Sequence, residues 1–444
     1  MLFGHSMPVM FAAAIGCFAV ALAVVALRSR QVLFLSVRNL LRNKRRTIIT
    51  VTVITFGTTG LMLQTAFMEN AFTSLRDATI TSGLGHIQIY KNGFNEKAAV
   101  DKTKYAIDNY GDIKSLLVHD PVIGKAIKSV TATVEFNCLV GSAEASAVCM
   151  GTGLEVGEDD VLSATDRLVE GRRLDGAGQQ DEGLIGQGLA HAIGAKVGDI
   201  LTVMAVTRTG AINAVDMSLK GVVQGAATEY DNTILKLPLK HAQQLMARGD
   251  VSRIVVLLND TARTREVSER LGVLFKEKGL DLETRTWEDL AVYYQSVVEL
   301  YRGMFIVFLV IVLTVVVFSI LNTMTMSVLE RVREIGTLRA LGAPKTEVRG
   351  MIHVEGVLMG LLGAGMAIVS ALVIAFVVNH LMGGLQMPPP PQRTFGYRAT
   401  FDLVQHPAIW LFGIFTSLIA GALSSIIPAR TAAKMEIVDA LRHY

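Results

Sequence analysis

The chain has 444 residues, of which 51 % are hydrophobic and 18 % are charged. Soluble proteins have about 25 % charged residues, so an ordinary soluble globular protein is excluded. The apolar residues are concentrated in runs of about 20, the length that an α-helix needs to cross a bilayer. The composition therefore indicates an integral membrane protein.

The net charge of +3 conceals two regions of opposite sign. The segment Glu69–Leu300 carries a net charge of −8, and the rest of the chain carries +11. Positive residues beside apolar runs mark the cytoplasmic side of a membrane protein. Because this charge is dispersed around the runs and not gathered on a soluble face, the sequence predicts no nucleic-acid partner.

The first apolar run, Val9–Leu27, is interpreted as an extra N-terminal transmembrane segment. Residues 1–7 contain no Lys or Arg, so they lack the positive region of a signal peptide. The positive flank follows the run instead. There, from Leu33 onward, apolar residues recur at the spacing of one helical face, and arginines fall on the other face. They predict an amphipathic helix at the cytoplasmic interface, in contact with membrane lipids.

Four further apolar runs predict four transmembrane helices, Thr47–Phe67, Met304–Met326, Val354–Val378 and Ile409–Ile427. In the third of these runs, Gly356, Gly360 and Ala364 have the small-residue spacing that allows close helix packing in lipid. The alternative is a glycine-tolerant span with no specific partner.

A large soluble domain of the α+β class is inserted between the first two of these helices, outside the membrane. Its glycines between Gly183 and Gly198 are read as turns, and its length of about 230 residues predicts two lobes. Apolar alternation predicts strands near His86–Tyr90, Thr131–Val140, Ala147–Gly151, Ile200–Val206, Met217–Val223 and Arg253–Leu258. Helical spacing predicts helices over Lys240–Ala247 and Ala262–Lys278.

The predicted fold is thus membrane α-helical, with a large α+β extracytoplasmic domain. Its boundaries in chain order are 1–30 for the extra segment, 31–46 for the interfacial helix, 47–68 for the first conserved transmembrane helix, 69–302 for the external domain, 303–326 for the next helix, 327–353 for a cytoplasmic coupling segment, 354–379 for a third helix, 380–408 for an external loop with a proline run, 409–428 for the last helix and 429–444 for a cytoplasmic tail.

Two of the three cysteines, Cys138 and Cys149, flank a short polar stretch. A hairpin turning between Ala143 and Glu144 would place them on opposite strands, near the spacing of a disulfide. A disulfide in an oxidising compartment and two free buried cysteines are both consistent with the sequence.

The sequence contains no signature of an energy-converting or metal-dependent enzyme. Gly342-Ala-Pro-Lys345-Thr346 is too short for a phosphate-binding loop, and His353-Val-Glu355 lacks the second histidine of a zinc protease motif. The histidines and cysteines show no metal-ligand spacing. We therefore expect no catalytic residue, no metal site and no cofactor in this chain, and any energy has to come from a partner.

The charged segment between the second and third of these spans carries the most specific motif. The run Arg333-Glu-Ile-Gly-Thr-Leu-Arg-Ala-Leu-Gly-Ala343 resembles the signature of the FtsX/MacB-type ABC transporter permeases, including their lipoprotein-releasing LolC/LolE branch. Pieces that resemble other parts of the family occur in the same order, at Leu40–Arg46, Gly85–Ile89, Glu170–Leu174, Ile185–Ala190, Val197–Asp199, Ile427–Arg430 and Ile437–Leu441.

The resemblance implies four conserved spans per subunit, a second permease copy or paralogue, and cytoplasmic ATPase subunits that bind ATP and Mg²⁺. It implies mechanotransmission, in which the ATPases move the external domains. The residues that it places in or beside the coupling helix are Arg333, Glu334, Gly336, Arg339, Ala340, Gly342 and Ala343. The alternative is a solvated connector whose charges only fix topology.

The favoured function is extraction or export of a lipoprotein or another amphiphile from the outer leaflet of the inner membrane. A periplasmic acceptor would receive it. Four apolar residues of the first conserved span are candidates for a lipid-facing substrate path, Phe56, Met62, Leu63 and Phe67. The alternative is a non-transporting, FtsX-like signalling scaffold that activates an extracytoplasmic hydrolase.

Overall fold

The computed structural model describes residues 10–16, 30–94, 105–155, 166–174, 181–207, 209–224, 231–387, 397–437 and 440. The chain divides into two compact units. The helical unit comprises Met1–Thr73, Val297–Gln386 and Arg398–Tyr444, and the mixed unit comprises Ser74–Ser296 and Met387–Tyr397. We describe each unit by itself.

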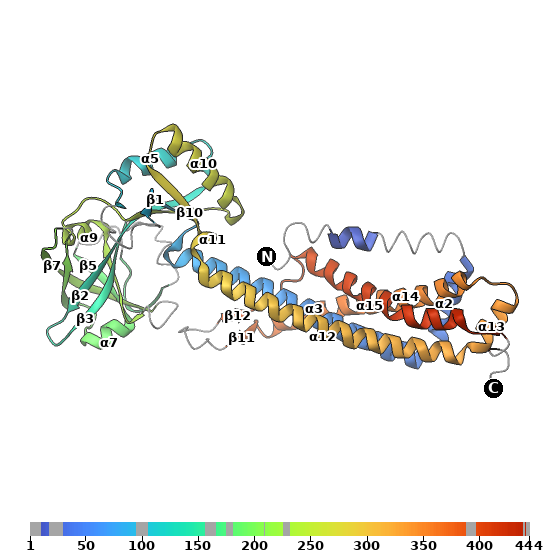
Figure 1. Ribbon diagram of the computed structural model, residues 1–444. Helices are drawn as coiled ribbons and strands as arrows, with labels where there is room; N and C mark the ends of the chain where they lie inside the picture. The colour runs from blue at the N-terminus through green and yellow to red at the C-terminus, as the bar shows by residue number, and fades with distance from the viewer. Residues whose placement is uncertain are drawn as a thin grey trace. The chain divides into compact units, whose positions relative to one another are not determined.

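Long helices make up most of the helical unit (Figure 1). In chain order the elements of this part of the chain are α2 (Arg30–Arg42), α3 (Lys44–Thr79), α12 (Val292–Glu330), α13 (Val332–Ala340), α14 (Lys345–Phe376), η5 (Val377–Leu381), β11 (Leu385–Met387), β12 (Tyr397–Ala399) and α15 (Pro407–Lys434). The two short strands β11 and β12 pair with each other.

Within the described residues, four helical stretches are long and apolar enough to cross a membrane, as the sequence predicts. They are Lys44–Leu84, Val292–Glu330, Lys345–Leu381 and Pro407–Lys434. The extra segment Val9–Leu27 lies outside the described residues except for 10–16, which are helical. The ring of Phe11 lies 5.0 Å from that of Phe415 on α15.

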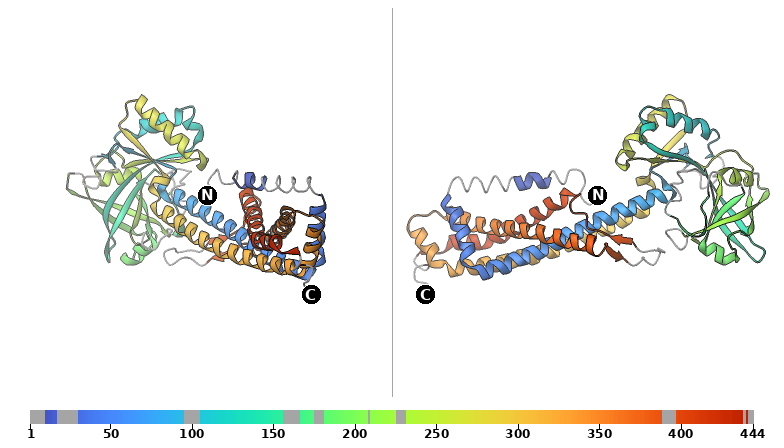
Figure 2. Two further views of the ribbon diagram at one scale, coloured as in Figure 1. Left: turned by 45° about the vertical axis from the view of Figure 1, so that its right-hand side comes forward. Right: turned by 180° about the vertical axis from the view of Figure 1, so that it is seen from behind.

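The helices α3 and α12 run side by side in opposite directions (Figures 1 and 2). The Thr50 hydroxyl donates to the Thr323 hydroxyl over 2.7 Å. Further along, a Cβ on Gly57 would lie 2.8 Å from Val316, so the missing side chain allows the helices to approach closely.

The closest packing in the helical unit joins α14 to α15. A Cβ on Gly356 would lie 2.5 Å from the carbonyl oxygen of Gly421, and one on Gly360 would lie 2.6 Å from that of Ser417. Ala364, one turn further, is buried. The small-residue spacing of α14 therefore serves a contact within this chain.

A ten-stranded sheet forms the mixed unit, in the order β10-β1-β9-β2-β3-β8-β5-β7-β4, with β6 paired to β2 and β7. The strands are β1 (Ile87–Lys91), β2 (Ile127–Gly141), β3 (Ser146–Leu154), β4 (Arg167–Gly171), β5 (Glu182–Gly186), β6 (Ile200–Val206), β7 (Ile212–Gln224), β8 (Ile234–Pro238), β9 (Arg253–Leu258) and β10 (Leu282–Thr286). The prediction that Gly183 and Gly186 form turns is wrong, because both lie in the buried strand β5.

Helices cover the core side of this sheet. They are η1 (Ile80–Leu84), α5 (Tyr110–His119), α6 (Ile123–Ala126), α7 (Gln187–Ile193), α9 (Leu239–Leu245), η4 (Thr261–Arg263), α10 (Thr264–Glu277) and α11 (Trp287–Leu290). One buried cluster extends from Ile87 on β1 to Leu219 on β7. The expected two lobes are therefore joined by a single sheet and one large core, and a smaller cluster surrounds Leu184 of β5. Thr286 caps α11, and its hydroxyl accepts from the Asp289 amide.

Candidate functional site

The segment with the family-like motif forms the helix α13, which is buried on one side only. Val332, Ile335 and Gly336 are buried, at the spacing of one helical face. Arg333 and Ala340 are exposed. The helix ends before Gly342, whose φ of +98° suits glycine, and Pro344 then precedes α14.

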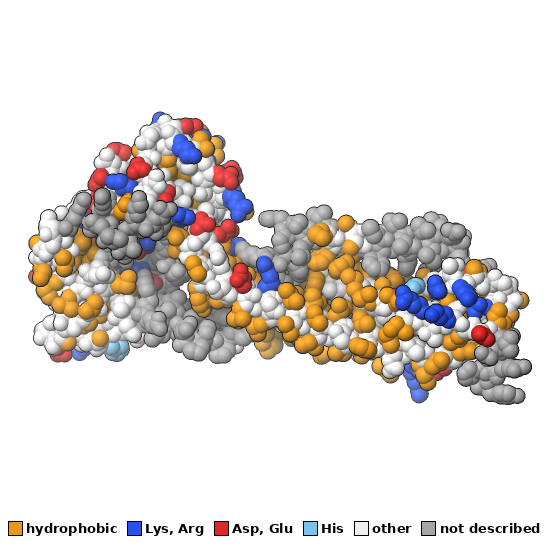
Figure 3. Space-filling view, in the orientation of Figure 1, with side chains coloured by type: hydrophobic (Ala, Val, Ile, Leu, Met, Phe, Trp, Pro, Cys, Tyr) orange, Lys and Arg blue, Asp and Glu red, His pale blue; other side chains and the backbone are white. Residues whose placement is uncertain are grey.

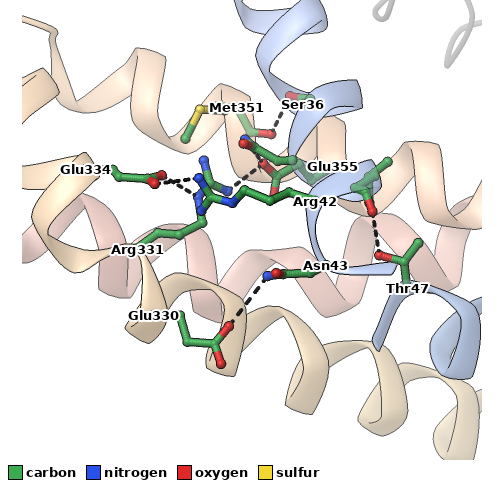
Figure 4. A network of polar contacts seen from close by, with 11 residues as sticks. Ser36, Arg42, Asn43, Thr47, Glu330, Arg331, Glu334, Met351 and Glu355 are labelled. Carbon is green, nitrogen blue, oxygen red and sulfur yellow. Dashed lines mark hydrogen bonds and ion pairs between the residues drawn. The ribbon is translucent and has the colours of Figure 1, made fainter. Parts of the chain in front are cut away.

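A buried ion pair fastens this segment to α14. Arg331, directly before α13, donates from Nη1 to Oε1 of Glu355 over 2.9 Å, and the two side chains are 7 % and 6 % exposed. Asn39 of α2 donates to the same oxygen over 2.7 Å. A buried carboxylate requires such partners, because an unpaired charge away from water is costly. These contacts join α2, α13 and α14 (Figure 4).

Glu334 on α13 extends the network to the end of α2. It accepts from Arg42 over 2.6 Å and from Arg331 over 3.1 Å. The hydrogen bond from Arg42 is the main reason why the pKa of Glu334 lies below its usual range, and it raises the pKa of Arg42. We name Asn39, Arg42, Arg331, Glu334 and Glu355 the latch. Its outer contacts are half-exposed, so only the loss of one partner from the pair with Glu355 should cost a large energy.

Two further contacts reinforce the latch from either side. Arg46 pairs with Glu330 at the end of α12, with 2.6 Å between Nη2 and Oε1. The Ser36 hydroxyl donates to the Met351 carbonyl over 3.2 Å. Lys and Arg side chains gather at this end of the helical unit, whereas hydrophobic side chains dominate its middle (Figure 3).

The C-terminal segment covers the inner side of α13. A Cβ on Gly336 would lie 2.8 Å from that of Ala440, so only glycine fits there. Arg339 donates to the carbonyl oxygen of Met435. The helix is therefore held by α2, α14 and the C-terminal segment.

The seven predicted coupling residues thus divide into two groups. Arg333, Ala340 and Gly342 are exposed, and Ala343 is half-buried. Glu334, Gly336 and Arg339 instead make contacts within the chain. Of the two arginines, Arg333 is exposed, whereas Arg339 is half-buried and bonded within the chain.

Sequence reasoning missed three residues that matter here. Arg331 and Glu355 are the charges buried at the junction, and a carboxylate at the start of an apolar run was the available signal. Leu341 is 81 % exposed directly after α13, although it is apolar. A single exposed leucine is common on protein surfaces, but this one lies beside the exposed Arg333 and Ala340.

Of the four candidate substrate-path residues of α3, Met62 does not share the face of the others; at 100° per residue, the other three fall within about 40°. Phe56 is 83 % exposed, whereas Met62 is buried at 1 %. The Met62 side chain packs where Gly413 of α15 leaves room. Leu63 and Phe67 lie against two different buried clusters. Met62 is therefore wrong as a lipid-facing residue, because α15 already covers it.

Cys138 and Cys149 face each other on β2 and β3, as a turn between Ala143 and Glu144 requires. Their Cα atoms are 5.1 Å apart, and the structure joins them as a disulfide. Both residues are buried in the core of the mixed unit.

These features define a class: a helical membrane protein with a large soluble domain inserted after its first spanning helix and a fastened, half-exposed helix between two later ones. Two family models match the chain. The MacB-like periplasmic core domain matches residues 47–273, and the FtsX-like permease C-terminal model matches residues 306–437. The chain belongs to the FtsX/MacB family of ABC transporter permeases.

Three relatives illustrate the range of the family. The chain is 21 % identical to the lipoprotein-releasing system transmembrane protein LolE of Haemophilus influenzae, over 90 % of this chain and 96 % of LolE. It is 24 % identical to LolC of Neisseria meningitidis, over 69 % and 75 % of the two chains. It is 28 % identical to the macrolide export ATP-binding/permease protein MacB of Salmonella typhimurium, over 50 % of this chain but 33 % of MacB.

Proposed function

We propose that this chain is the permease subunit of a transporter driven by a separate cytoplasmic ATPase, which binds the exposed side of α13. The observation that carries the proposal is Leu341, an apolar side chain that is 81 % exposed beside the exposed Arg333 and Ala340. Together with Arg333, a residue type enriched at interface hot spots, Leu341 gives this side of α13 both an apolar and a charged contact. ATP and Mg²⁺ belong to that partner.

The latch supports transmission of force from such a partner. Because α13 is fastened to α14 through Arg331 and Glu355, a push on α13 moves α14 and α2 with it. The helix α12 is continuous from Val292 to Glu330, so it links α13 along the chain to the mixed unit. We propose that ATP-driven closure of two ATPases moves two such permeases, either identical or paralogous, by this route.

The proposed substrate is a lipoprotein or another amphiphile in the outer leaflet of the inner membrane, with the mixed unit in the periplasm. The match to LolE over nearly the whole of both chains supports this class. The match to MacB covers a third of that protein, so it weighs less. Basic residues gathered beside α13 support a cytoplasmic position for that end.

The experiment compares two full-length variants with equally exposed apolar residues. Leu341→Arg changes the proposed docking side chain, and Val404→Arg is the control, since Val404 is 79 % exposed in the loop before α15. Each protein is purified from its native membranes, and the rate of ATP hydrolysis by the ATPase that co-purifies with it is measured. We expect hydrolysis with the wild type and Val404→Arg, and its loss with Leu341→Arg.

Equal hydrolysis in all three samples would refute docking through Leu341, and hydrolysis by the chain stripped of partners would refute the separate motor. The substrate is tested by depletion. If the chain releases lipoproteins, its depletion leaves them in the inner membrane. Their normal distribution would contradict the proposed substrate.

A further inference from the structure

The outer face of the sheet carries exposed apolar side chains on four adjacent strands. Leu139 of β2 lies opposite Val148 of β3 and Met204 of β6. Val206 of β6 lies opposite Ile212 of β7. Residues at the alternate positions of these strands, such as Val140 and Val203, point into the core. Because side chains alternate along a strand, the apolar residues between them point outward. We name this set the apolar face; its members are Leu139, Val148, Met150, Met204, Val206 and Ile212.

Four of these six side chains are exposed, and Leu139 and Met204 are half-buried. Val148 is 72 % exposed, Ile212 is 76 %, and Met150 and Val206 are both 59 %. A contiguous apolar surface of this kind marks a binding site in most soluble domains. Polar groups bound it: Thr202 donates to Asp216 over 2.7 Å at one edge.

A cavity of about 360 Å³ adjoins the apolar face. Asn137 of β2 and Met150 of β3, which lie opposite each other, line the cavity, and Leu84 of η1 lines it as well. The ring of Phe136 fits against Gly151, where any Cβ would collide with it. This volume is within the range of small-molecule sites, about 300–1,000 Å³. The cavity and the apolar face thus form one continuous surface.

Polar groups without partners line the same cavity. Thr133 is 3 % exposed, and its hydroxyl has no hydrogen-bond partner among the described residues. Arg253 pairs with Glu135 over 2.6 Å through Nη2 and also hydrogen-bonds to Tyr90, yet its buried Nε–H has no partner among the described residues. Buried polar atoms in folded proteins are nearly always bonded to protein, water or a ligand, so these two offer a ligand one N–H donor and one hydroxyl.

We propose that the cavity and the apolar face bind a single-chain amphiphile whose head has no net charge. The hydrocarbon chain lies along Met150 and its apolar neighbours, and the head accepts a hydrogen bond from Arg253 Nε–H and exchanges one with the Thr133 hydroxyl. Because Glu135 already neutralises Arg253, a head with a net negative charge gains little there. A flat protein partner covers the face but leaves both polar groups unsatisfied, so the amphiphile is favoured.

This inference draws on the proposed function only for the origin of the amphiphile, and its test needs no ATPase. The full chain in lipid nanodiscs is mixed with a zwitterionic twelve-carbon phosphocholine that carries a photoreactive diazirine on its chain, about the length that a cavity of this class accepts. After illumination, the labelled peptides are identified by mass spectrometry. We expect labelling in the peptides that contain Phe136 and Met150.

Three variants decide the outcome. Met150→Glu places a charge on the chain path and should lower labelling about tenfold, whereas Val169→Glu, at an exposed apolar residue of β4, should leave it unchanged. Thr133→Val removes the unpartnered hydroxyl and should lower labelling several-fold without loss of thermal stability. Absence of label at these peptides, or equal labelling of Met150→Glu and Val169→Glu, would overturn the proposal.

A cross-linking experiment distinguishes the amphiphile from a second copy of the chain. A photoreactive residue at Val148 that cross-links to a second copy of the chain, with a yield that the amphiphile does not lower, would overturn the proposal in favour of a dimer interface. We expect the amphiphile to compete with any such cross-link.

Discussion

Replacing Arg331 with methionine leaves the Glu355 carboxylate buried without its ion-pair partner. The two side chains are 7 % and 6 % exposed and 2.9 Å apart, and Asn39 supplies one neutral donor. Breaking a buried pair from one side costs about 3–5 kcal/mol, because the remaining charge stays desolvated. A loss of 3 kcal/mol lowers the melting temperature of a unit this size by about 6–12 °C.

The assay follows thermal unfolding of the full chain in nanodiscs by tryptophan fluorescence, to which Trp410 of α15 contributes from within the helical unit. Arg333→Met is the matched control, since Arg333 is exposed two residues further on. Exposed substitutions usually stay within about 0.5 kcal/mol. Glu355→Gln combined with Arg331→Met should recover part of the loss, because no buried charge then remains.

Equal melting temperatures for Arg331→Met and Arg333→Met would refute the reasoning. So would a double variant that is less stable than the sum of its two single changes. Either result would mean that Glu355 reaches water or another cation, and that the latch does not hold α13 to α14.

Three further predictions concern other parts of the chain. Gly360→Val should destabilise the α14–α15 contact by about 1–3 kcal/mol, whereas Gly365→Val, where a Cβ meets open space, should be tolerated; the yield of folded protein measures this. Reducing the bond between Cys138 and Cys149, which are 11 residues apart, should cost the mixed unit about 2–3 kcal/mol in urea unfolding, and no change would mean that both are free thiols. Burial, followed by the charge of Arg76, lowers the pKa of His86 to about 4. The free energy of unfolding of the mixed unit should therefore be highest above pH 6.5 and fall by up to about 2 kcal/mol as the pH drops toward 4, after allowance for screening. A flat pH profile that matches that of His86→Gln would contradict this.

The membrane-spanning helices could be predicted from the sequence because a bilayer imposes length and apolarity that few other structures require. The strand β6, whose burial alternates, and β9, a continuous apolar run, were predicted at their observed bounds. β5 was missed because its glycines suggest turns. In the structure, Gly183 and Gly186 are needed for space, since a Cβ on Gly186 would collide with the Asp231 carbonyl.

The site was harder to predict, because its residues come from segments far apart in the sequence. The position of α13 was evident from its motif, but Asn39 and Glu355 are 316 residues apart and meet only after folding. The burial of Met62 was missed for a related reason. An apolar span gives no indication of which side another helix covers, and the space left by Gly413 determines that Met62 faces α15.

The latch is better explained by geometry than by stability. A buried ion pair is often no more stabilising than apolar side chains of the same volume, and the half-exposed contacts from Arg42 and Arg46 contribute little energy each. Their effect is directional: Glu334 is bound to Arg42 of α2 and Glu330 to Arg46 of α3, so the junction of α12 and α13 is held at two points and α13 is constrained against rotation. With Gly336 seated against Ala440, rotation would also create a steric clash. The exposed position of Leu341 is therefore fixed by the network, which is what a surface that receives force from a partner requires.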